Sequence, residues 1–132
     1  MDQTTRFVIL ENITRYSEQY ERCGCPEKQA LLRRLIVEEE RKFAHCSERL
    51  DVTDRHIERA AYRITTLEHS IALSQAHDDD TVDMERRLAN LKSFRALLYD
   101  LRKIWADLVE KGDDQMADRD SGAAPSNRLD GA

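Results

Sequence analysis

The sequence has few of the residues that β-sheet proteins and exported proteins need. Aromatic residues make up 6% of the 132 positions, and the chain contains only four glycines and two prolines. Strands and tight turns use these residues heavily, so their scarcity favours helices. Near the N-terminus the densest apolar run, at residues 7–10, is too short for a signal peptide or for a membrane span of roughly 20 residues. We therefore expect an all-α, soluble, cytoplasmic protein without membrane contact.

The motifs of common enzymes are also missing. The sequence contains no glycine-rich phosphate loop, no serine elbow and no HExxH. None of its four histidines follows a glutamate by three residues, as the ligands of di-iron helical bundles do. We interpret the histidines as surface or boundary residues, and we predict neither enzymatic activity nor a cofactor.

The charge of the chain argues against nucleic acid as a partner. Its net charge of −5 opposes attraction to nucleic acid or to an anionic membrane. A basic stripe does occur at Arg55, Arg59 and Arg63, but acidic residues such as Asp51 and Glu58 are interleaved with it. We interpret this stripe as a solvated helix face with local ion pairs.

The strongest pattern is an apolar heptad repeat in the middle of the chain. Large apolar residues recur there at strict spacings of seven, at Ile36, Phe43, Leu50, Ile57, Ile64 and Ile71. No glycine or proline interrupts residues 27–76. Such a repeat is typical of a long helix with a coiled-coil-like seam. We predict one very long central helix over about residues 27–76, roughly 75 Å in length.

Two further helices are expected beside the central one. Apolar residues at 3–4 spacing predict a helix over about 4–22, and a second heptad pattern predicts another over about 82–111. Asp80 or Thr81 would cap the start of the last helix, and Gly112 would end it. The predicted architecture is an elongated antiparallel helical hairpin, or three-helix coiled-coil-like bundle, with one very long central helix.

The C-terminal residues differ in composition from the rest. Residues 113–132 contain five aspartates, and one methionine and one leucine are their only large apolar residues. So little apolar surface cannot offset the entropy lost on ordering. We expect residues 1–112 to form one helical domain and residues 113–132 to be a disordered acidic tail.

A rod only two helices thick would leave part of the last helix uncovered. Four apolar residues make its stripe broader than a two-stranded seam requires: Leu97, Leu101, Ile104 and Leu108. Exposed apolar surface of this kind commonly binds a partner. We predict that these residues bind a second copy of the chain, as a homodimer, or another helical protein. The predicted function is a non-enzymatic interaction or scaffold module.

The three cysteines leave an alternative function open. Cys23 and Cys25 lie in the stretch YERCGCPEK, where Gly24 suits a helix-ending residue with positive φ and Pro26 suits the first position of the next helix. If the central helix is continuous, Cys46 lies roughly 30 Å from Pro26 and cannot complete a metal site within one chain. Two such turns across a dimer axis would still supply four thiolates. The alternative is therefore a thiol-based metal or redox sensor that uses Cys23 and Cys25.

Two groups of short segments resemble a known kind of protein. The first group is NITRY at residues 12–16, a turn ending at Pro26, LL at 31–32 and EEE at 38–40; the second is HIER at 56–59 followed by AHDDDT at 76–81. Both are similar to segments of short bacterial helical-hairpin proteins of unknown function. The resemblance implies a cytoplasmic helical protein without catalytic activity. Those proteins usually carry an acidic residue just before the proline, where this chain has Cys25.

Overall fold

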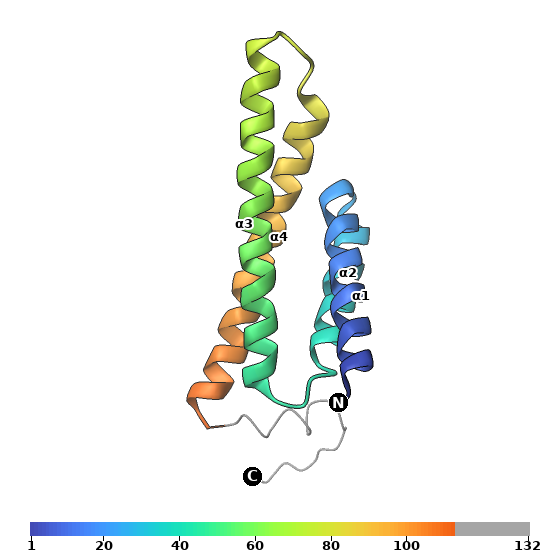
Figure 1. Cartoon of the computed structure of the whole chain (residues 1–132), viewed down its shortest axis with the longest axis vertical. Coiled ribbons are helices and arrows are strands. Elements are labelled where there is room, and N and C mark those ends of the chain that lie inside the picture. The colour runs from blue at the N-terminus through green and yellow to red at the C-terminus, as the bar shows by residue number, and fades with distance from the viewer. Residues whose placement is uncertain (113–132) are drawn as a thin grey trace.

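The computed structural model describes residues 1–112, which form four helices and contain no strand (Figure 1). The helices are α1 (Gln3–Arg22), α2 (Pro26–Glu40), α3 (Cys46–Ala76) and α4 (Val82–Glu110). The prediction of an all-α protein is confirmed. The predicted acidic tail at 113–132 lies outside the described residues. Within those described, no helix is both long enough and apolar enough to cross a membrane.

The single central helix predicted over 27–76 is wrong. The chain leaves the helical path at residues 41–45 and turns back, so two helices stand where one was expected. Instead of a three-helix hairpin, the chain forms two helical hairpins, α1–α2 and α3–α4. The α1–α2 hairpin lies along the lower half of the longer α3–α4 hairpin (Figure 1).

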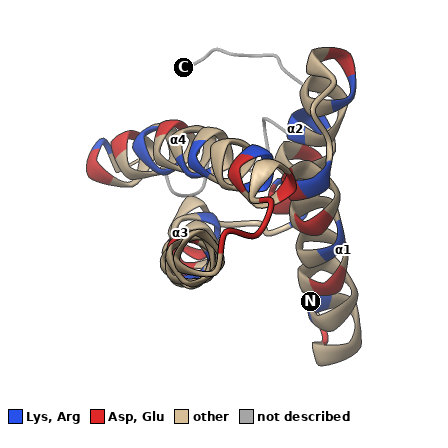
Figure 2. Ribbon diagram, turned by 90° about the horizontal axis from the view of Figure 1, so that it is seen from above, with Lys and Arg blue, Asp and Glu red and all other residues tan. Residues whose placement is uncertain are grey.

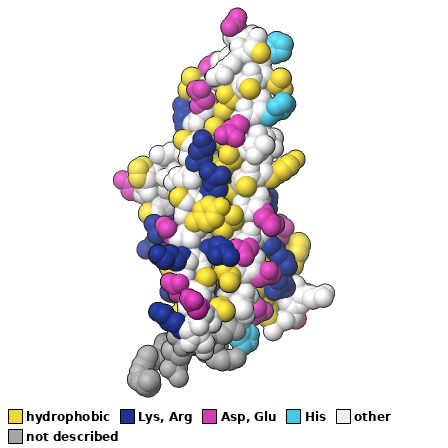
Figure 3. Space-filling view, turned by 90° about the vertical axis from the view of Figure 1, so that its left-hand side faces the viewer, with side chains coloured by type: hydrophobic (Ala, Val, Ile, Leu, Met, Phe, Trp, Pro, Cys, Tyr) yellow, Lys and Arg dark blue, Asp and Glu magenta, His cyan; other side chains and the backbone are white. Residues whose placement is uncertain are grey.

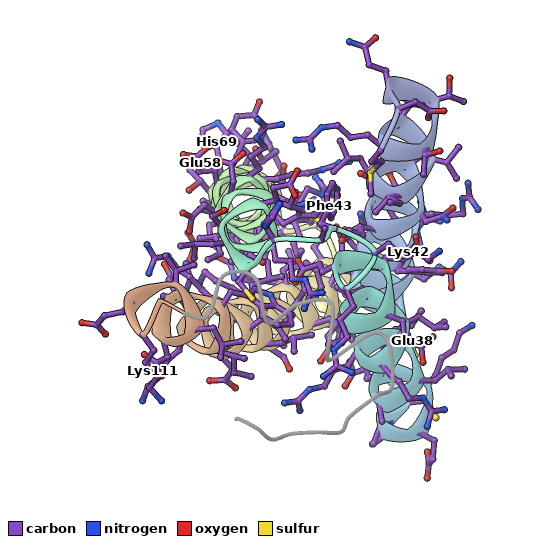
Figure 4. The ribbon with its side chains drawn as sticks, turned by 90° about the horizontal axis from the view of Figure 1, so that it is seen from below. Glu38, Lys42, Phe43, Glu58, His69 and Lys111 are labelled. Atoms are coloured by element: carbon purple, nitrogen blue, oxygen red, sulfur yellow. The ribbon has the colours of Figure 1, made fainter. Side chains whose placement is uncertain are left out.

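A buried arginine stabilises the turn that breaks the heptad helix. Arg49 donates from Nε to the carbonyl of Phe43 at 3.0 Å and from Nη2 to the carbonyl of Arg41 at 2.9 Å. Phe43 leaves the helix at this turn and is fully buried in the core between the hairpins (Figure 4). The seven-residue spacing of apolar residues therefore continues through the turn, although the backbone is no longer helical there and changes direction.

The ends of the helices follow local capping rules. Asp2 accepts a hydrogen bond from the amide of Thr5 at 2.7 Å at the start of α1, and Asp80 accepts one from the amide of Val82 at 2.9 Å before α4. Gly112 ends α4 with a φ of 75°, a conformation that glycine adopts without steric cost. Gly24 does not have the positive φ that was expected, because the chain passes from α1 to α2 through extended residues.

The main core lies where the two hairpins meet. α3 packs along α4, and α1 packs against both α2 and α4. Seen from above, α4 crosses α3 obliquely and the α1–α2 hairpin lies beside the pair (Figure 2). The core joins Phe43 of the turn to apolar residues of all four helices: Ile9, Ile13, Tyr20, Leu32, Ile36, Val52, Ala60, Phe94, Leu97, Leu98 and Leu101. A smaller cluster of Ile64, Leu67 and Leu91 holds the upper part of α3 and α4 together.

Candidate functional site

A groove between α1 and α3 contains a pocket of about 270 Å³. Both helices pack on α4, which lies beneath them. Ala60 from α3 and Leu91 and Phe94 from α4 give the pocket an apolar floor, and all three residues are buried members of the core clusters. Its remaining lining is polar or lies at the rim: Ser17, Glu18, Glu21, His56, Arg59, Tyr62 and Arg63.

Arginine side chains of α3 bridge the groove to α1. Arg59 donates to the Thr14 hydroxyl at 2.8 Å and lies 3.7 Å from the Glu18 carboxylate. Further along α3, Arg63 donates to both carboxylate oxygens of Glu21, at 3.1 and 3.0 Å. These polar contacts lie at the rim of the groove, and the apolar residues of the floor lie below them between the helices.

Glu21 is the most heavily bonded carboxylate of this groove. Arg87 of α4 donates to it at 2.9 and 2.6 Å, in addition to Arg63. Burial alone would raise the pKa of Glu21, but the hydrogen bonds and charges of Arg63 and Arg87 outweigh it and lower the pKa below its ordinary value. Glu21 is therefore ionised at neutral pH and holds α1, α3 and α4 together at one point.

The turn at residues 23–25 is connected to α4 through backbone carbonyls, and the Cys23 thiol accepts a hydrogen bond from the Cys25 amide within the turn at 3.4 Å. Gln29 donates to the carbonyl of Cys23 at 2.8 Å and to Asn90 Oδ1 at 3.3 Å. Asn90, which is buried on α4, donates in turn to the carbonyl of Glu21 at 2.8 Å. The end of α1 is thereby tied to α4 beside the groove.

His56 is a functional candidate that the sequence interpretation missed. It was expected at the surface or boundary, but its side chain is only 7% exposed and forms part of the pocket wall. Its Nδ1 lies 2.8 Å from the carbonyl of Val52, which can only accept, so Nδ1 carries the proton. Nε2 is buried and has no hydrogen-bond partner among residues 1–112. The sequence did offer one signal for the burial of His56. It directly precedes Ile57 of the heptad row, and residues beside an apolar seam are often half-buried.

The electrostatic surroundings keep the His56 ring neutral. Burial lowers the pKa of His56, and the positive charges of Arg59 and Arg55 lower it further, against the opposite effect of the bond to Val52. At neutral pH, Nε2 therefore presents a lone pair and accepts hydrogen bonds without being able to donate one.

The structure does not bring the three cysteines together. Cys23 is half-buried and Cys25 exposed in the turn between α1 and α2, while Cys46 is buried at the start of α3 beside Trp105. The 15 residues of α2 separate Cys46 from the turn. The Cys25 thiol donates to the Glu27 carboxylate at 3.0 Å. Across residues 1–112, no group of three or more His, Cys, Asp or Glu side chains is placed to hold a metal ion.

The four residues predicted to bind a partner are not an exposed stripe. Leu97 and Leu101 are 5% and 4% exposed because the α1–α2 hairpin covers that face of α4. Leu108 is partly buried beside Trp105, and Ile104 alone among the four is well exposed, at 50%. Apolar side chains on the face shown in Figure 3 are interspersed with charged side chains of both signs. The expectation that these leucines are free for a partner is therefore wrong for Leu97 and Leu101.

The sequence matches no protein-family model, and the searches of curated proteins and of solved structures found no match either. The resemblance to short bacterial helical-hairpin proteins stays a prediction.

Proposed function

We propose that this protein is a non-enzymatic helical interaction module that binds an apolar side chain of a partner protein in the groove between α1 and α3. The observation that carries this proposal is the apolar floor of Ala60, Leu91 and Phe94 beneath a rim of charged side chains. A buried apolar pocket ringed by polar groups is the usual form of an anchor site at a protein interface. We therefore propose the groove, and not the α4 stripe, as the partner surface.

The size and charge of the groove favour a side chain over a free cofactor. Pockets for drug-sized ligands and cofactors commonly measure about 300–1,000 Å³, and this pocket, at about 270 Å³, falls below that range. The side chains of Arg59 and Arg63 are 54% and 37% exposed along the rim. Both guanidinium groups already pair with Glu18 and Glu21, and their exposed sides can in addition meet acidic residues that flank the inserted side chain.

Photocrosslinking from the rim tests this proposal. Tyr62 lines the pocket and is 75% exposed, so replacing it by benzoylphenylalanine places a reactive group at the mouth without disturbing the core. We expect illumination of cells that produce this variant to give one dominant adduct. Adding Ala60→Phe, which fills the pocket floor, should reduce the adduct severalfold. Immunoblotting measures the yield, and mass spectrometry identifies the partner, including a second copy of the chain.

Two controls separate the groove from the general surface. Tyr99 on α4 is 52% exposed and lies outside the pocket, so a crosslinker there should not give the same adduct. Ala72→Phe adds the same ring to an exposed position of α3 and should leave the yield unchanged. Ala60→Leu serves if the phenylalanine variant loses helical circular dichroism. Equal adducts from positions 62 and 99, or a yield that Ala60 variants do not change, would refute the proposal.

A further inference from the structure

The turn between α1 and α2 contains two accessible thiols that the proposed groove does not use. Cys25 is exposed and Cys23 is half-buried, with Gly24 alone between them, whereas Cys46 is fully buried beside Trp105. Among residues 1–112, no third His, Cys, Asp or Glu side chain is placed to bind a metal together with this pair. An ion held at this turn by one chain therefore has two sulfur ligands from the protein.

The backbone of the turn brings the two sulfurs toward the same place. Cys23 and Cys25 have extended backbone, with φ of −99° and −87°, and side chains two positions apart on extended backbone lie on one side. The Cys25 amide donates to Cys23 Sγ at 3.4 Å, so this sulfur already lies over residue 25. A methyl group at Gly24 would meet no atom within 4 Å, so the turn is open there. Rotation of the Cys25 side chain about its Cα–Cβ bond then lets both sulfurs approach one ion.

A pair of thiolates suits a soft monovalent ion better than a divalent one. Zn²⁺ takes four ligands, and Ca²⁺ and Mg²⁺ take oxygen, whereas Cu(I) prefers sulfur and two thiolates in a line satisfy it. Both thiols lose their protons on binding, so one Cu⁺ replaces two protons and the site gains one negative charge. Cys25 is the N-cap residue of α2, and its side chain makes no capping hydrogen bond. The positive end of the helix dipole therefore stabilises this charge.

We infer that Cys23 and Cys25 of one chain form a two-coordinate site for Cu(I) at the start of α2. This site is separate from the groove, and neither depends on the other. The Cys25 thiol donates to the Glu27 carboxylate at 3.0 Å, and a thiolate at the same place is repelled by that carboxylate. Glu27→Gln should therefore tighten Cu(I) binding severalfold.

Anaerobic titration of the reduced full chain with Cu(I) held by bicinchoninate tests the inference, because the coloured chelate reports how much ion the protein removes. We expect one Cu(I) per chain and an unchanged elution volume in gel filtration. Cys23→Ser and Cys25→Ser should each lower the affinity by about a hundredfold or more, the usual gain from tethering a second ligand. Cys46→Ser should bind as wild type does, because Cys46 is buried away from the turn.

The double variant Cys23→Ser/Gly24→Cys is the matched control. It keeps two thiols but places them on adjacent residues, whose side chains point to opposite sides of extended backbone. Gly24 does not have positive φ, so a side chain is tolerated there, and this variant should bind Cu(I) about tenfold more weakly than wild type. If it binds equally, the arrangement of the two thiols carries nothing and the inference is wrong. One Cu(I) per two chains, or loss of binding in Cys46→Ser, would also overturn the one-chain site and leave the groove untouched.

Discussion

Replacing Glu40 by glutamine should raise the free energy of unfolding at about pH 8 by on the order of 3 kcal/mol. Glu40 is fully buried at the end of α2, where it accepts hydrogen bonds from Trp105 Nε1 at 2.8 Å and from the Thr53 hydroxyl at 2.9 Å. Burial outweighs these bonds and the charge of Arg49, and raises the pKa of Glu40 from 4.5 to about 7. Above that pH the folded protein must hold an ionised carboxylate in its core.

The direction of the pH effect follows from this raised pKa. In the unfolded chain the Glu40 carboxyl loses its proton near its ordinary pKa of 4.5, whereas in the folded chain it keeps the proton up to about pH 7. The protonated carboxyl therefore contributes its full stabilisation below about pH 4.5, and this contribution is lost as the pH rises through 7. Glutamine resembles the protonated form at every pH, so the difference in unfolding free energy between Glu40→Gln and wild type should grow over this interval.

The hydrogen bonds around Glu40 show why the neutral form fits. The Thr53 hydroxyl has one proton, and it lies 2.8 Å from the carbonyl of Arg49 as well as 2.9 Å from Glu40. A protonated Glu40, or a glutamine, can donate to this hydroxyl while Thr53 donates to the carbonyl. The ionised carboxylate competes with that carbonyl for a single proton.

Glu38→Gln is the control for this prediction. Glu38 is exposed on α2, and Figure 4 shows it on the side of the helix that faces away from α3. Chemical denaturation from about pH 4.5 to about pH 8 should show nearly equal curves for Glu38→Gln and wild type. A Glu40→Gln protein whose stability changes with pH as wild type does would show that Glu40 is not the buried titrating group.

Much of the helical pattern could be predicted because its signals are local. Asp80 before α4 and Gly112 after it act on the nearest backbone groups, and the short sequence around them is sufficient to recognise such caps. The turn at residues 41–45 contains neither glycine nor proline, and its local signal is a capping box of His45 and Glu48 at the start of α3. The change of direction before that cap is further stabilised by Arg49 and by the burial of Phe43, which the pattern of the sequence does not indicate.

The same distinction explains why the candidate site was missed. Once the chain turns after Glu40, the α1–α2 hairpin covers Leu97 and Leu101, and the surface expected to bind a partner becomes core. His56 becomes part of a pocket only because α1, far away in the sequence, lies opposite it across the groove. The periodicity identified which helix faces are apolar. Which helix packs against each of these faces depends on where the predicted long helix is interrupted.

The second large effect is expected at the turn itself. Replacing Arg49 by methionine should lower the free energy of unfolding by about 3 to 5 kcal/mol, the usual result of removing one member of a buried charged network. Arg49 is fully buried, and its guanidinium lies 4.8 Å from the Trp105 ring centroid while donating to the carbonyls of Arg41 and Phe43. Methionine retains much of the volume but leaves both carbonyls without this donor, and it removes the positive charge that lowers the pKa of Glu40.

Arg55→Met provides the matched control on the same helix. Arg55 pairs with Asp51 at 3.3 Å, and both side chains are more than half exposed, so its loss should change stability by about 0.5 kcal/mol or less. Arg49→Lys should also be strongly destabilising, because one ammonium group cannot reproduce the two directed bonds of the guanidinium. If urea denaturation finds Arg49→Met as stable as Arg55→Met, the carbonyls at the turn do not depend on Arg49. The burial of Phe43 would then be the main interaction that stabilises the turn, and Phe43→Ala would lower the free energy of unfolding more than Arg49→Met.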